Sequence, residues 1–207
     1  MLVEFRASSG ARLCDALVSR GWRYFESTSP VGRVNGLCVL SRTPIVCIHP
    51  CPAPKENSER WLEVSFPAHN FGVGLLHIVA AESKGKCEGK TSFWNAVLQA
   101  AHNRLAEPFL FIGDFNTGAP FTDEVGNTFA CAEHFAKLSA FGWTDMWRHY
   151  NRETREGTWY SSKGNGFRLD HAFASPSLRP RIASCRYSHV EREAKVSDHS
   201  ILIVEVD

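Results

Sequence analysis

The sequence predicts an α/β protein in which sheets lie at the centre and helices cover them. Short apolar runs bounded by turn residues, which are typical of strands, outnumber the segments with helical spacing. Several of these runs are joined by links of hairpin length. The 207 residues are 43% hydrophobic and include 14 Phe and 6 Trp, enough large apolar side chains for one sizeable core. We therefore expect a single domain that spans residues 1–207.

The individual elements follow from hydrophobic spacing and turn residues. Helical spacing predicts helices at residues 11–20, 91–105 and 130–140, and Gly21 and Gly142 end the first and the third. Apolar runs predict strands at residues 36–40, 45–48, 61–66, 72–79, 109–112, 168–174 and 200–206. The run FLFI at 109–112 is wholly apolar, which is typical of a strand buried on both faces.

Composition excludes several classes of protein. A formal net charge of +1 at pH 7 excludes a strongly basic protein that coats nucleic acid, although it permits a local basic patch. No run of 18 apolar residues is present, so we expect no membrane span. The first residues, MLVEFRASSG, do not resemble a signal peptide. The 7 Cys residues form no CxxC pair, and this odd number favours reduced thiols and a cytoplasmic protein.

Polar side chains gather where three predicted strands begin or end. Asp114 and Asn116 follow the strand at 109–112 and lie two residues apart, so their side chains point to the same side. Asp170 lies inside an otherwise apolar strand, where a carboxylate is costly unless it is paired. Asp198 and His199 directly precede the last strand. A turn or a cap explains each segment alone, but together they predict a catalytic or phosphate-binding site.

Three motifs carry a resemblance to a known family. GDFN at 113–116, RLDH at 168–171 and SDH at 197–199, in this order, resemble the endonuclease/exonuclease/phosphatase superfamily, which includes pancreatic deoxyribonuclease-like and exonuclease III-like enzymes. The segments NGLCVLSRTPI at 35–45 and KTSFWNAVL at 90–98 extend the resemblance over nearly the whole chain. The resemblance implies a four-layer α/β-β/α sandwich of two packed mixed sheets with outer helices. It also implies a divalent-metal-dependent phosphoesterase.

The resemblance also implies a role for each catalytic candidate. Asp114 is expected to handle the proton of the attacking water, and Asn116 to orient the phosphate or the nucleophile. His199 is expected to bind and polarise the scissile phosphate, while Asp170 forms a hydrogen bond to His199. His77, near the end of a predicted strand, is expected to act near the leaving group.

The N-terminus departs from the family pattern. Family members open with a strand ending in Asn, then a helix, then a strand ending in Gln-Glu, and residues 1–6 resemble only the end of that second strand. We therefore expect the first strand to be missing here, either because the start lies inside a longer gene product or because the protein has lost this element, which leaves a gap beside residues 2–5. Glu4 and Asp198 are expected to bind Mg²⁺ or Mn²⁺, because hard carboxylate oxygens suit these ions. Weak metal binding and slow turnover are the expected result.

The substrate is less well defined by the sequence. Residues 145–195 carry ten Lys and Arg against six Asp and Glu, with aromatic residues among them. Basic groups beside aromatic rings favour DNA or RNA, although a solvated strand face explains them equally well. The expected substrate contacts are Asn35, Trp159, Tyr160 and Arg168. The open alternatives are a phosphatase or phosphodiesterase acting on a small-molecule or lipid phosphoester, and an inactive truncated member kept as a binding module.

Overall fold

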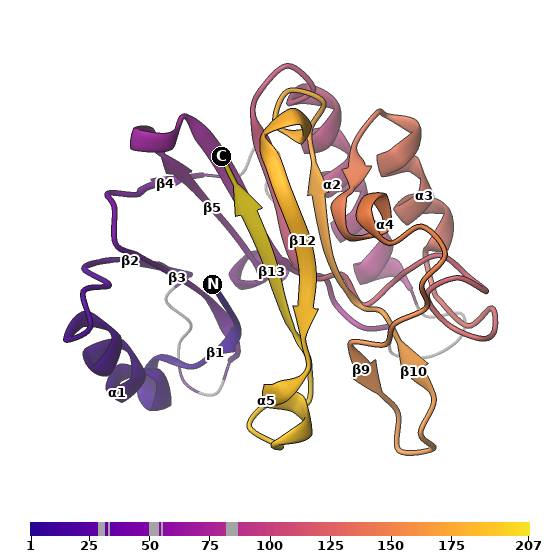
Figure 1. The fold of residues 1–207 in the computed structure, drawn as a ribbon, viewed down its shortest axis with the longest axis horizontal. Helices are drawn as coiled ribbons and strands as arrows, with labels where there is room; N and C mark the ends of the chain where they lie inside the picture. The colour runs from indigo at the N-terminus through magenta and orange to yellow at the C-terminus, as the bar shows by residue number, and fades with distance from the viewer. Residues whose placement is uncertain (29–31, 33, 50–53, 55, 82–86) are drawn as a thin grey trace.

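A computed structural model describes residues 1–207 apart from 29–31, 33, 50–53, 55 and 82–86. The described chain forms four layers (Figure 1): helix α1 (Ala7–Val18), a divided layer of strands, a six-stranded sheet, and helices α2 (Glu88–Asn103) and α3 (Ala132–Ala140). This is the expected α/β sandwich with helices outside. No helix within the described ranges is long and apolar enough to cross a membrane.

The six-stranded sheet is mixed. Its order is β4 (Val46–Ile48), β5 (Trp61–Phe66), β6 (Phe71–His77), β7 (Phe109–Asp114), β11 (Asp170–Ala174) and β8 (Thr144–Asp145). Strands β6 and β7 run parallel and α2 lies between them in the chain, whereas all other neighbours are antiparallel. As expected, the start of β7 is buried on both faces: Phe109 and Phe111 pack against α2 and α3, and Leu110 packs into the core between the sheets.

The second layer of the expected sandwich is divided into two antiparallel pieces within the described residues. One piece has the order β1 (Leu2–Phe5), β3 (Gly36–Ser41) and β2 (Tyr24–Ser27), and the other pairs β12 (Ile182–Ser188) with β13 (Ile201–Val206). Within the described residues, β1 pairs only with β3, and β13 pairs only with β12. The gap expected beside residues 2–5 is therefore present, and it lies between β1 and β13.

Several strands and short helices of the structure were not predicted from the sequence. These are β2, β8, β12, the hairpin of β9 (Trp159–Tyr160) and β10 (Gly166–Phe167), and the helices α4 (Met146–Tyr150) and α5 (Val190–Glu193). In β12 the register shifts between Ile182 and Ser184, so the alternation of buried and exposed residues is interrupted. Strand β11 begins at Asp170 rather than at 168, because the amides of Arg168 and Leu169 donate outside the sheet, to Asp123 and Thr158.

Arg168 is a structural residue, and its expected contact with substrate is wrong. Its guanidinium is 1% exposed and donates to both carboxylate oxygens of Asp123, at 2.8 and 3.0 Å. It also donates to both oxygens of Asp145, at 3.2 and 2.6 Å. The two carboxylates hold the pKa of Arg168 above its usual value against the opposing effect of burial. With its donors used in this way, the side chain is not available to a phosphate.

We predict that Arg168→Met lowers the free energy of unfolding by about 3–5 kcal/mol, because it removes the buried guanidinium that donates to both Asp123 and Asp145, and only Asp123 keeps another guanidinium, that of Arg148. Urea denaturation followed by tryptophan fluorescence measures this loss. Arg152→Met, at an exposed position, is the matched control and should change stability by less than about 0.5 kcal/mol. Equal stabilities of the two variants would contradict the structural role of Arg168.

Candidate active site

The register of three strands gathers the candidate catalytic residues. His77 at the end of β6 lies opposite Asp114 of β7, and Asp114 lies opposite Asp170 at the start of β11. Directly paired residues project from the same face of a sheet, so the three side chains form one row. All three are buried. Gly113 permits this packing, because it has a φ of +137° and an added Cβ would lie 2.0 Å from the carbonyl oxygen of Leu76.

The turn after β7 is held by Asn116. This residue has a φ of +48°, and its backbone amide and side-chain amide donate to the two oxygens of Asp114, each at 2.8 Å. The side-chain amide also donates to the carbonyl of Ile78 at 2.9 Å. Both oxygens of Asp114 are thus fixed in position. In this arrangement Asn116 orients the carboxylate of Asp114.

Lys90 supports the same turn, although it was not among the candidates. Its buried ammonium donates to the carbonyl of Asn116 at 2.6 Å, and burial lowers its pKa. The sequence held a signal for it, because Lys90 precedes Phe93 and Trp94 by three and four residues and so lies on the apolar face of α2. A charged residue on a buried helix face needs a specific partner.

Asp170 and His199 form the expected pair. Nδ1 of His199 donates to Oδ2 of Asp170 at 2.9 Å. The Tyr187 hydroxyl donates to the carbonyl of Asp170 at 2.5 Å, and Oγ1 of Thr158 accepts from its amide at 3.3 Å. The carbonyl of Thr158 accepts from the amide of Ser200 at 2.9 Å. Thr158 thus ties the loop that carries His199 to the start of β11.

Burial and charge set different protonation states along the row. Burial lowers the pKa of His199, but the hydrogen bond to Asp170 and the charges of Asp170, Asp114 and Asp198 outweigh it and raise the pKa to about 9. Burial and the neighbouring charge of Asp170 raise the pKa of Asp114 above its ordinary value. Burial, together with the positive charges of Arg60 and His199, lowers the pKa of His77 to about 4. At pH 7, His199 is a cation and His77 is neutral.

The two expected metal ligands are not in contact. Glu4 lies beside the row, with Oε1 3.9 Å from Nε2 of His77, and that nitrogen is 3.6 Å from Oδ2 of Asp114. The Glu4 side chain is 61% exposed and its carboxylate is open to a cation, which fits a divalent ion that prefers oxygen ligands. Asp198 is exposed on the loop before β13, and no contact joins it to Glu4 within the described chain. Arg60, which sequence patterns did not reveal, donates to the ring of His77 at 3.1 Å.

The other substrate candidates, Tyr160, Trp159 and Asn35, differ in exposure and in their partners. Tyr160 is 45% exposed, and the Arg192 guanidinium lies 4.6 Å from its ring centroid. Trp159 is half-buried and packs against Phe167. The hairpin β9–β10 and α5 project from the same end of the molecule (Figure 1). Asn35, just before β3, is half-buried and accepts from Nε of Arg6 at 2.5 Å, so it fixes the chain beyond β1.

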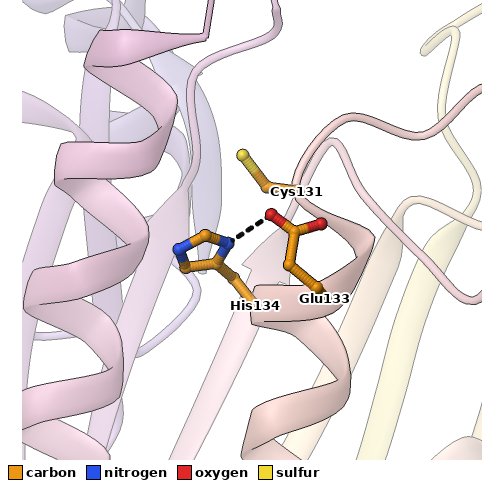
Figure 2. Close-up of side chains that lie close together, drawn as sticks. All are labelled: Cys131, Glu133 and His134. Atoms are coloured by element: carbon orange, nitrogen blue, oxygen red, sulfur yellow. Dashed lines mark hydrogen bonds and ion pairs between the residues drawn. The ribbon is translucent and has the colours of Figure 1, made fainter.

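A second group of potential metal ligands lies at the start of α3 (Figure 2). The ligand atoms of Cys131, Glu133 and His134 lie within 4.8 Å of one another. Each already has a partner in the protein: the ring of His134 lies 2.9 Å from Glu133, and the Cys131 thiol lies 3.6 Å from the Thr91 hydroxyl. Thiolate and imidazole ligands suit zinc rather than Mg²⁺, so this group does not match the chemistry expected of the row.

We predict that Asp170→Asn lowers the pKa of His199 towards 6.5, measured by NMR titration of the imidazole signals. In the unchanged protein the hydrogen bond and the charge of Asp170 raise the pKa of His199 from the ordinary value of 6.5 to about 9. The pair therefore stabilises the fold fully below about pH 6.5, and this contribution is lost as the pH rises through about 9. An unchanged His199 titration in the variant would contradict the pairing.

Known structures share this fold. NExo, a 3' phosphatase from Neisseria solved with a product DNA hairpin, superposes with a TM-score of 0.83 and 20% identity over 99% of this chain and 86% of that chain. The 3'-5' exonuclease NExo from Neisseria meningitidis has a TM-score of 0.78 and 22% identity, covering 93% and 82%. An AP endonuclease from Archaeoglobus fulgidus has a TM-score of 0.80 and 18% identity, covering 99% and 86%.

The sequence comparisons place the chain in a family. No curated protein sequence matches it. Residues 1–199 match the Endonuclease/Exonuclease/phosphatase family, and the three motifs that carried the resemblance all lie inside this range. The protein whose row of His77, Asp114 and Asp170 is described above belongs to the Endonuclease/Exonuclease/phosphatase family.

Proposed function

We propose that this protein is a divalent-metal-dependent phosphoesterase that hydrolyses phosphodiester bonds in DNA or RNA. The observation that carries the proposal is the hydrogen bond that holds His199 on Asp170, directly across the sheet from the buried Asp114. The hydrogen bond and the charge of Asp170 raise the pKa of His199 to about 9, which favours its cationic form. Phosphoester hydrolysis requires a proton acceptor for water and positive charge on the phosphoryl oxygens. This pair of groups provides both.

Each residue of the candidate active site has its own role in phosphoester hydrolysis. His199 donates from Nε2 to a non-bridging phosphoryl oxygen, since its Nδ1 is already bonded to Asp170. Asp114 accepts the proton of the attacking water, and its raised pKa brings it closer to the operating pH of a general base. Asn116 keeps Asp114 in position. His77 is neutral and lies near the leaving group, where it exchanges a proton.

The metal is part of the proposal. Glu4 would hold Mg²⁺ or Mn²⁺ through its exposed carboxylate, and Asp198 would approach as a second ligand. A bound divalent ion neutralises phosphate charge and orients the substrate. The exposure of both carboxylates supports this assignment, because neither is engaged in a buried ion pair.

A nucleic acid is favoured over a small phosphoester by the hairpin next to the site. Tyr160 presents an exposed ring beside Arg192, and exposed Arg152, Lys163 and Lys195 belong to the same part of the sequence. The solved relatives include a 3' phosphatase with product DNA and an AP endonuclease. Arg168 is buried in ion pairs with Asp123 and Asp145 and adds nothing to this basic surface. A phosphatase acting on a small phosphoester remains the second candidate, since His199 and Asp114 alone suffice for it.

We predict that His199→Gln and Asp170→Asn each reduce Mg²⁺-dependent cleavage of DNA by at least about 100-fold. The double variant should lose little more than His199→Gln alone, because Asp170 acts through His199. Plasmid nicking and release of inorganic phosphate, each with and without Mg²⁺, provide the two assays. His134→Gln is the matched control and should retain full activity. Strictly multiplicative losses would show that Asp170 and His199 act independently.

If all variants and the unchanged, folded protein are inactive in both assays, the third alternative, a binding module, replaces the proposed function. Phosphate release without nicking would instead assign the phosphatase.

We predict that Tyr160→Ala raises KM for DNA about 5- to 150-fold, because one stacked base contributes about 1–3 kcal/mol. The KM for bis(p-nitrophenyl) phosphate should stay unchanged, since this small ester does not reach the hairpin. Tyr24→Ala, at an exposed ring of β2, is the matched control. Equal effects on both substrates would remove Tyr160 from nucleic-acid binding.

A further inference from the structure

Four side chains form a line of hydrogen bonds next to the loop that carries His199. Nε of Arg192 donates to Oγ of Ser200 at 3.0 Å, and the same oxygen lies 2.7 Å from Nδ1 of His189. Nε2 of His189 lies 2.6 Å from Oε1 of Glu156. We call these four residues the His189 network. It joins the segment before β9, helix α5 with the residue before it, and the residue before β13.

One assignment of protons gives every member of the network a partner. The Glu156 carboxylate only accepts, so Nε2 of His189 carries the proton and donates to it. Nδ1 of the neutral ring then accepts from the Ser200 hydroxyl, whose oxygen in turn accepts from Arg192. Ser200 is 4% exposed, and a buried hydroxyl without partners is costly. The network therefore fixes the Ser200 side chain in one orientation.

A Ser, a His and a Glu in a line also describe the nucleophile, the base and the orienting acid of a hydrolase. Exposure and hydrogen-bond partners argue against that role here. The Ser200 hydroxyl is buried and already accepts from a guanidinium, whereas 29% of the His189 side chain and 27% of the Glu156 side chain are exposed. A nucleophile has to reach its substrate, so we assign the network to holding the structure rather than to attacking a bond.

Ser200 connects the network to the catalytic pair. It directly follows His199 in the sequence. Its amide donates to the carbonyl of Thr158 at 2.9 Å, and Oγ1 of Thr158 accepts from the amide of Asp170 at 3.3 Å. Residues 156–158 thus hold Ser200 through its backbone and, by way of the network, through its side chain. Because the same segment also holds Asp170, it sets the separation between the two members of the pair.

Helix α5 holds the start of the same loop. The carbonyl of Glu191 accepts from the amide of Val196 at 2.9 Å. His189 precedes α5, so its hydrogen bond to Glu156 ties this helix to the segment before β9. Figure 1 shows α5 and β9 at the same end of the molecule. Both ends of the loop that carries His199 are therefore bound to elements that the network joins.

We propose that the His189 network positions His199 for catalysis. Glu156 and His189 act through the Ser200 hydroxyl and hold the loop in one conformation. In that conformation Nδ1 of His199 stays on Asp170 and Nε2 faces the phosphate. The inference rests on the proposed function and deepens it, because it assigns positioning residues to the same site. Since these residues act through Ser200, their loss should lower kcat and leave KM unchanged.

His189→Leu tests the proposal, because it removes both hydrogen bonds of the ring and keeps an apolar side chain of similar size. We expect kcat for Mg²⁺-dependent DNA cleavage to fall about 10- to 100-fold, with KM changed by less than about twofold. His189→Gln retains one donor and one acceptor, so it should restore kcat to within about threefold of the unchanged protein. His102→Leu, at an exposed position of α2, is the matched control and should keep full activity.

Ser200→Ala tests whether the effect passes through the hydroxyl. It removes one oxygen atom and should lower kcat as much as His189→Leu does. The double variant should lose little more than either single one, because both act through the same group. Ser200→Ala also carries the test if urea denaturation shows that His189→Leu does not fold. Losses that multiply in the double variant, or a raised KM at unchanged kcat, would overturn the inference.

A spectroscopic readout separates this inference from the proposed function. The proton between Nδ1 of His199 and Asp170 is expected to give a low-field NMR signal, which His199→Gln removes. In His189→Leu and Ser200→Ala this signal should broaden through exchange with water, whereas in His102→Leu it should stay sharp.

An unchanged signal in His189→Leu and Ser200→Ala would overturn the inference even if kcat falls, because the effect would then not pass through His199. A protein without this signal lacks the pair, and the inference fails with it. If the unchanged protein cleaves no substrate but its signal responds as expected, the network still positions His199, and only the proposed function fails.

Discussion

The shared register of β6, β7 and β11 is the constraint on which the candidate active site depends. Parallel pairing of β6 with β7 and antiparallel pairing of β7 with β11 place His77, Asp114 and Asp170 in one row. A shift of one residue in either pairing would turn the side chains of one strand to the opposite face. Gly113 permits the close approach of β6 to β7 at this point. The relative positions of His77, Asp114 and Asp170 are therefore set by the sheet, and His199 joins them from the loop before β13.

This row places the buried carboxylates of Asp114 and Asp170 next to each other. Their combined negative charge determines which groups must surround them. Asp114 and Asp170 would repel each other if both were ionised and uncompensated. His199 relieves this repulsion as a cation bound to Asp170, while Asn116 and Lys90 secure the turn that presents Asp114. The same electrostatic balance that permits burial also provides an acid and a base side by side. Stability and chemistry thus share one set of interactions.

The sequence revealed the candidates that follow apolar strands, because strand ends and alternation are local features. Asp114 and Asn116 were readable in this way, and Asp170 stood out as a carboxylate in an apolar run. The role of Arg168 was not readable. Its partners Asp123 and Asp145 are 45 and 23 residues away, and a count of charges cannot distinguish a buried ion pair from a basic patch. The layers could also be predicted, because the apolar runs and helical spacing that define them are local features of the sequence. The division of the second layer depends on pairing between strands far apart in the sequence, which local patterns do not reveal.

The most direct test of the account is anomalous diffraction from crystals soaked with Mn²⁺ and a short DNA product. We expect a Mn²⁺ peak at coordination distance from the carboxylate of Glu4, with a phosphate oxygen within hydrogen-bond distance of Nε2 of His199. A Mn²⁺ peak only at Cys131 and His134, or a phosphate bound away from His199, would contradict it.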